Sequence, residues 1–292
     1  MTANPPLNYG ERLGAAFDRF GHLCVGIDPH PWLLDRWGLA DTADGAREFG
    51  LRVVEAVWNR AGIVKPQVAF FERYGSAGYL GLERVLAEAR SAGLFVIADA
   101  KRGDVGSTVE AYAQAWLTRG SPLESDAMTI SAFQGVGSLA APFALAMAAD
   151  KGLFVLAATS NPEAAALQRA RVGEGSSAGS TVAGAIMAEI REWNAVRPDE
   201  RFGSAGVVLG ATLDLASFGV DTEEEERGAI LPVLAPGFGH QGASVSETRR
   251  IYGTLSPGVI VSESRGLLGA GPEGIEDAVA RRAEEVEAQR GR

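Results

Sequence analysis

The feature that most constrains the fold is a regular alternation of short apolar runs with longer amphipathic segments. Eight runs rich in aliphatic residues occur at residues 23–27, 63–64, 95–98, 127–130, 153–158, 205–209, 230–234 and 259–261. Strands this short and this uniformly apolar are typical of a parallel sheet that is covered on both faces. Apolar residues at helical spacing lie around and between them, at residues 9–20, 46–61, 80–92, 105–117, 139–149, 181–193 and 275–289.

Eight strands that alternate with helices predict an α/β protein with a closed (β/α)₈, or TIM, barrel. We expect a single domain over residues 1–292, with a short N-terminal helix at 9–20, because no linker or low-complexity tract divides the chain. An open doubly wound sheet is the alternative. No GxGxxG follows the first predicted strand, so a dinucleotide-binding fold lacks its main support.

The composition of the chain limits the classes of binding partner and the cellular compartment that we expect. The formal net charge of −10 argues against nucleic acid and anionic membranes as partners. The single cysteine, Cys24, lies in an apolar run and predicts no intrachain disulfide. The chain starts without the basic and apolar regions of a signal peptide, so we expect a cytoplasmic protein. His22, His30 and His240 are not spaced as metal ligands, and no metal site is predicted.

Charged residues gather where the third predicted strand ends, in the stretch FVIADAKRGDVGST at residues 95–108. Side chains two apart on a strand share a face, so Asp99 and Lys101 should point together. The turn at Gly103 then brings Asp104 near them. Catalytic groups of a barrel come from the carboxyl ends of several strands, which makes this cluster a candidate active site.

Other predicted strands also end in polar residues, namely Asp28, Lys65 and Ser160. The seventh strand is followed by APGFGHQG and the eighth by SESRG. In this fold the loops after strands seven and eight often bind phosphate through backbone N–H groups and guanidinium donors. We therefore expect Gln241 and Arg265 to hold a phosphate, with a surface salt bridge as the alternative role of Arg265.

The stretches GIDP, IVKPQVAFFE, DAKRGD, ATSNP, APGFGHQG and SESRG occur in this order between residues 23 and 268. Together they resemble the orotidine 5′-phosphate decarboxylases, in particular the longer bacterial (type 2) branch with the DAKRGD motif. The resemblance implies a carboxy-lyase of de novo pyrimidine biosynthesis that converts orotidine 5′-phosphate to UMP and CO₂ without a cofactor. It also implies a homodimer with shared active sites.

The resemblance further implies roles for single residues. The catalytic array would be Lys65, Asp99, Lys101 and Asp104, with Asp104 reaching into the neighbouring subunit's site. The substrate would be bound at the ribose by Asp28 with Lys65, across the subunit interface by Thr108, at the pyrimidine edge by Ser160, and at the phosphate by Gln241 and Arg265.

The residue types make this chemistry intelligible. An ammonium held by carboxylates stays protonated, because nearby opposite charges favour its charged form. Lys101 can therefore stabilise the carbanion that forms at C6 and then donate a proton to it.

Two other classes of function remain open at this point. One is a Mg²⁺-dependent sugar-phosphate decarboxylase or lyase on the same barrel, or a Schiff-base aldolase that uses Lys65 or Lys101. The other is a non-catalytic protein that binds a phosphoribosyl ligand. The binding protein is disfavoured, because close carboxylates repel one another and a binder has little need to hold them together.

Overall fold

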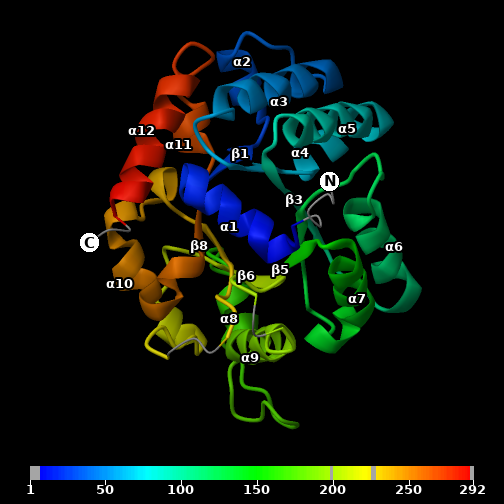
Figure 1. Ribbon diagram of the computed structural model, residues 1–292, viewed down its shortest axis with the longest axis vertical. Helices are drawn as coiled ribbons and strands as arrows, with labels where there is room; N and C mark the ends of the chain where they lie inside the picture. The colour runs from blue at the N-terminus through cyan, green and yellow to red at the C-terminus, as the bar shows by residue number, and fades with distance from the viewer. Residues whose placement is uncertain (1–6, 198–199, 225–227, 290–292) are drawn as a thin grey trace, which may run out of the picture.

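The computed structural model describes residues 7–197, 200–224 and 228–289, and its centre is a closed barrel of eight parallel strands (Figure 1). Each strand pairs with the next along the chain, and β8 pairs with β1 to close the ring. The TIM-barrel prediction is confirmed. The strands are β1 Leu23–Ile27, β2 Ile63–Pro66, β3 Phe95–Arg102, β4 Ala127–Ile130, β5 Gly152–Ala158, β6 Ala205–Leu209, β7 Val233–Pro236 and β8 Val259–Glu263.

Helices surround the barrel and connect successive strands. The longer ones are α1 Tyr9–Phe20, α3 Ala43–Val57, α5 Gly75–Ser91, α6 Gly106–Leu117, α7 Ala140–Ala149, α9 Val182–Asn194 and α12 Ile275–Ala288. The short ones are α2 Pro31–Arg36, α4 Ala69–Glu72, α8 Ala164–Gln168, α10 Thr248–Tyr252 and α11 Arg265–Leu268. Single 3₁₀ turns are η1 Val136–Leu139, η2 Leu215–Phe218, η3 Gly239–Gln241, η4 Val245–Glu247 and η5 Gly253–Gly258.

Alternate residues of each strand enter two separate cores. Cys24, Ile63 and Ile97 belong to a cluster that fills the barrel interior. Val25 and Val64 belong to the larger cluster between the barrel and its outer helices. Because successive side chains of a strand point to opposite faces, a strand buried on both faces must be apolar throughout. This explains the uninterrupted apolar runs of the sequence.

Helix α1 closes the amino-terminal end of the barrel and lies across it in Figure 1. Its apolar face carries Tyr9, Leu13 and Phe17, which pack into the barrel-interior cluster. The helix begins at a capping box in which Asn8 and Glu11 each accept a hydrogen bond from the other's backbone N–H. With this end closed, the open end of the barrel is the one where the strands finish.

Several predicted boundaries were wrong, for local reasons. The seventh strand is Val233–Pro236 rather than residues 230–234, because Pro232 has no N–H to donate to a ladder. The third strand continues to Arg102, which still pairs with β4. Helix α3 ends at Val57, since Asn59 adopts a left-handed φ of 59°. Helix α5 begins before residue 80, in a stretch of poor helix formers that hid its start.

Among the described residues, no helix is long and apolar enough to cross a bilayer. The N-terminal helix lies at Tyr9–Phe20, where the sequence predicts it. The predicted domain extent of 1–292 includes positions outside the described residues and stays a prediction.

Candidate active site

The predicted site residues of four neighbouring strands lie on one rim of the barrel. Lys65 is in the last part of β2, Asp99 and Lys101 are near the end of β3, Asp28 directly follows β1, and Arg265 starts α11 after β8. These strands are adjacent and parallel in the order β8, β1, β2, β3. Their carboxyl ends therefore form a continuous arc.

Asp99 bridges two lysines at the centre of this arc. Lys65 Nζ lies 3.0 Å from Asp99 Oδ2, and Lys101 Nζ lies 2.6 Å from Asp99 Oδ1. Their contact places Asp99 and Lys101 on one face of β3, as the strand alternation predicts. The side chains of Lys65 and Asp99 are each 8% exposed, whereas that of Lys101 is 44% exposed. Lys101 is thus the member of the array that a substrate can reach.

The charges of the array set its pKa values. Burial opposes the charge of Asp99, but the two lysines outweigh it and hold the pKa of Asp99 well below its ordinary value. Burial also opposes the charge of Lys65, yet Asp99 and then Asp28 raise the pKa of Lys65. At Lys101, partial burial together with repulsion from Lys65 outweighs Asp99, so the pKa of Lys101 lies below that of a free lysine. This direction differs from the expectation that neighbouring carboxylates favour the charged form, because burial has the larger effect. The array therefore contains one firmly ionised acid, one firmly charged lysine and one lysine that gives up its proton more easily.

The backbone of Lys101 is strained. Its φ of 47° lies in the left-handed region, which a lysine rarely adopts. The pairing of β3 with β4 shifts register between Ala98 and Arg102, so the strain coincides with an irregularity of the ladder. The Lys101 N–H donates to Thr129 Oγ1 at 2.9 Å, and that hydroxyl donates to Asp99 Oδ1 at 2.8 Å. Thr129 thus ties the strained backbone to the bridging carboxylate.

Two residues of this site, Thr129 and Gln67, were missed in the sequence. Gln67 accepts a hydrogen bond from Lys101 Nζ at 3.3 Å, and its amide nitrogen, turned toward Asp99, donates to the carboxylate. Both residues could have been found from the sequence. Thr129 is the polar residue of an otherwise apolar strand, and it lies two positions after Ala127, so both side chains face the barrel interior. Gln67 lies two positions after Lys65.

Asp28 and Arg265 both act electrostatically on His30 at the end of the arc. The Oδ1 atom of Asp28 is buried and has no hydrogen-bond partner among the described residues. The charges of both residues act on the imidazole ring of His30. Burial lowers the pKa of His30, and Arg265 lowers it further while Asp28 opposes the change. The described part of the chain therefore leaves a buried acceptor at Asp28, on the same rim as the cation at Arg265.

The loops after β7 and β8 are held together by Glu263, which the sequence analysis had not singled out. Its side chain is 2% exposed and pairs with Arg282 at 3.0 Å. A Cβ atom added to either Gly239 or Gly266 would lie 2.3 Å from Glu263 Oε1, so both backbones pack directly on the carboxylate. Gly239 also has a φ of 65°, which favours glycine. The carboxylate thus underlies both η3, which carries Gln241, and the start of α11 with Arg265.

Of the other predicted site residues, Asp104 is partly buried and the remaining three are exposed. Asp104 accepts a hydrogen bond from the Val105 N–H at 2.8 Å, and within the described residues it forms no ion pair with Lys101. Thr108 is exposed in the first turn of α6. Ser160 and Gln241 are exposed after β5 and β7. One chain therefore brings Lys65, Asp99 and Lys101 into contact and leaves Asp104 apart from them. In the described part of the chain, no group of three or more His, Cys, Asp or Glu side chains is placed to hold a metal ion.

Comparisons with known proteins agree with this geometry. The model of the "Orotidine 5′-phosphate decarboxylase / HUMPS family" matches residues 21–273. The orotidine 5′-phosphate decarboxylase of Salinispora tropica is 49% identical over 267 residues, which are 91% of each chain. That of Streptomyces coelicolor is 47% identical over 91% of each chain.

Solved structures show the same relationship. A crystal structure from Streptomyces avermitilis, assigned to the same enzyme, superimposes with a TM-score of 0.90 at 44% identity and covers 100% of this chain and 99% of its own. The OMP decarboxylase of Leishmania donovani has a TM-score of 0.77 at 30% identity, over 98% of this chain and 100% of its own. The resemblance seen in the motifs is confirmed, and the chain belongs to the orotidine 5′-phosphate decarboxylase / HUMPS family.

Proposed function

We propose that this protein removes CO₂ from orotidine 5′-phosphate to give UMP, in pyrimidine biosynthesis, and that it needs no cofactor. The observation that carries the proposal is the Lys65–Asp99–Lys101 array on the same rim as Arg265. Family membership supports it, because the similar proteins are named as this decarboxylase. A cytoplasmic location stays a prediction.

The proposed role of Lys101 follows from the electron pair that the reaction leaves behind. When the bond between C6 and the carboxylate breaks, CO₂ departs and the electron pair stays on C6, in the plane of the ring, where delocalisation helps little. The Lys101 ammonium stabilises that pair and gives its proton to C6, and the resulting amine regains a proton from solvent. A pKa below that of a free lysine suits this transfer. Asp99 holds the ammonium in place.

The remaining residues of the rim would bind the substrate. Arg265 and Gln241 would hold the phosphate, since guanidinium and amide donors match its oxygens. The buried Asp28 Oδ1 would accept from a ribose hydroxyl, with Lys65 beside it. Ser160 would contact the edge of the pyrimidine. Binding energy from the phosphate would then position C6 against Lys101.

We further propose a homodimer in which Asp104 and Thr108 act in the neighbouring subunit's site. Two exposed apolar side chains near them support an interface, with Val105 53% and Phe133 74% exposed. Their loops are in contact, because a Cβ added to Gly103 would lie 2.6 Å from the Ser131 carbonyl oxygen. Asp104 of a second subunit would supply the additional carboxylate that Lys101 lacks within its own chain.

A direct assay tests the reaction. Purified protein should deplete the absorbance of orotidine 5′-phosphate, and Lys101→Ala should reduce the rate by several orders of magnitude, while Arg84→Ala on the exposed side of α5 serves as the control. Activity should survive treatment with a chelator, and borohydride should trap no adduct on a lysine. An inactive wild-type protein would refute the proposal.

Subunit mixing tests the shared site separately. Lys101→Ala and Asp104→Ala chains are each expected to be inactive alone. A hybrid dimer contains one site with both residues intact, so random exchange should restore about a quarter of the wild-type activity. Confirmed exchange without recovery would eliminate the trans role of Asp104 and leave the assignment of Lys101 in place.

A further inference from the structure

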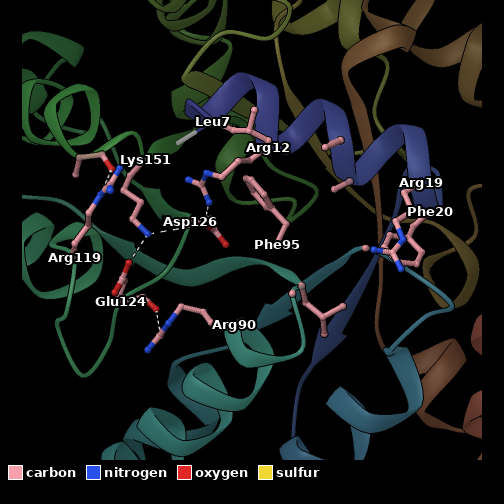
Figure 2. Close-up of a pocket in the computed structure, with 16 residues that line it drawn as sticks. Leu7, Arg12, Arg19, Phe20, Arg90, Phe95, Arg119, Glu124, Asp126 and Lys151 are labelled. Atoms are coloured by element: carbon pink, nitrogen blue, oxygen red, sulfur yellow. Dashed lines mark hydrogen bonds and ion pairs between the residues drawn. The ribbon is translucent and has the colours of Figure 1, made fainter. Parts of the chain in front are cut away.

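A cavity lies at the end of the barrel opposite the proposed active site, where the strands begin. It has a volume of about 550 Å³ and lies along one side of α1, beside the residues that precede β2, β3, β4 and β5. Figure 2 shows Arg12 and Phe95 between a charged group around Lys151 and a second end at Arg19. A cavity of this size is large enough for a small organic ligand. None of the active-site residues described above lines it.

The lining of this cavity is cationic although the whole chain carries a net charge of −10. Its basic side chains outnumber its carboxylates five to two. The basic residues are Arg12, Arg19, Arg90, Arg119 and Lys151, and the acidic residues are Glu124 and Asp126. Such a local excess of positive charge attracts anions.

Both oxygens of each carboxylate already accept a hydrogen bond from a protein donor. Glu124 accepts from Lys151 Nζ and from the Gly120 N–H, each at 2.8 Å. Asp126 accepts from Arg12 and, at 2.8 Å, from the Val96 N–H. The two carboxylates are therefore engaged with the protein's own donors and are outnumbered by the basic side chains.

The donors, in contrast, are in excess. Arg90 donates to the Glu124 carbonyl oxygen, and Arg19 lies 4.6 Å from the centre of the Phe20 ring. Within the described residues neither arginine forms an ion pair with a carboxylate, although the positive charge of Arg90 helps to lower the pKa of the nearby Glu124. A guanidinium has five N–H donors and no acceptor, so each has unused capacity for an oxyanion.

We infer that this cavity is a binding site for a small organic oxyanion, a phosphate ester or carboxylate with a planar apolar part. The guanidinium of Arg90 would bind the oxyanion, and Arg19 would add positive charge. The partly exposed ring of Phe20 would pack against the apolar part. The site is separate from the proposed decarboxylase centre and does not depend on its assignment.

Calorimetric titration with phenyl phosphate tests this inference, and benzoate in a parallel titration distinguishes phosphate from carboxylate preference. The wild-type protein should bind phenyl phosphate at two sites per chain. In Arg265→Ala, which removes the proposed phosphate ligand at the other rim, one saturable site should remain. Adding Arg90→Gln to that variant should weaken the remaining site by about tenfold, because a charge-assisted hydrogen bond is lost.

Arg84→Gln is the matched control, because Arg84 lies on the same helix as Arg90 but outside the cavity. Added to Arg265→Ala, it should leave the affinity for phenyl phosphate unchanged.

Arg19→Gln in the same background is a second test, because Arg19 lies at the exposed end of α1 and its substitution does not disturb the ion pairs of the lining. The inference is overturned if Arg265→Ala binds neither probe, or if Arg90→Gln and Arg19→Gln bind as tightly as Arg84→Gln. Thermal melting of each variant verifies that it is folded.

Discussion

Asp99→Asn tests the electrostatics of the rim most directly, because it removes a charge and keeps the shape of the side chain. Asp99 is the carboxylate that contacts both lysines, and the side chains of Lys65 and Asp99 are equally buried. Removing one partner of a buried ion pair costs about 3–5 kcal/mol, since the other charge is left uncompensated. Asp28 also attracts Lys65, so we expect the lower end, about 3 kcal/mol.

The loss of folding stability in Asp99→Asn should become smaller as the pH rises. In the wild type the pKa of Lys65 is raised, so its stabilising effect is fully present at neutral pH and disappears only in strong alkali. In Asp99→Asn, burial acts without that attraction, and the pKa of Lys65 falls below its value in the unfolded chain. The unfolded variant then binds more protons than the folded one, so its stability rises with pH. The deficit should therefore shrink between about pH 7 and about pH 9.

Urea unfolding at both pH values measures the deficit, and the melting temperature should fall by about 6–12 °C. Glu48→Gln is the control. Its ion pair with Arg52 is on the surface of α3, and its loss should change the free energy of unfolding by less than about 0.5 kcal/mol. A deficit below about 1 kcal/mol, or one that is the same at both pH values, would refute the reasoning.

Three further predictions concern the loops, the barrel end and the cysteine. Glu263→Ala should raise the KM for orotidine 5′-phosphate by about tenfold with a smaller change in kcat, because it removes the support under the phosphate loops. Glu263→Gln should restore most of the affinity, and Glu285→Ala, in an exposed ion pair, should have little effect. Gly152→Ala should lower the free energy of unfolding by about 1–3 kcal/mol in urea, because the new Cβ would lie 2.2 Å from the Tyr9 ring. Burial raises the pKa of Cys24 to about 12, so a thiol reagent at pH near 8 should modify it in urea and leave the native protein unmodified.

Part of this result was accessible from the sequence because it depends on local patterns. A strand buried on both faces must be apolar, and this requirement made the eight strands visible and predicted the closed barrel. Polar residues at the carboxyl ends of such strands lie on the same rim of the barrel. The sequence therefore predicted that Lys65, Asp99 and Lys101 lie close together, and they do. Predicted boundaries were wrong where a proline or a left-handed residue interrupted the pattern, as at Pro232 and Asn59.

Other features depend on how distant segments meet. Thr129 and Gln67 enter the site through the pairing of β3 with its neighbours and through the unusual backbone of Lys101, neither of which a periodic pattern specifies. Glu263 supports two loops because glycines far apart in sequence pack on its carboxylate. The sequence by itself determined the barrel and the charged residues on its rim, since alternation and strand ends are local properties. Only the tertiary structure decided which side chains contact these charged residues. It also decided where the cationic cavity lies beside α1, because both features join residues that are distant along the chain.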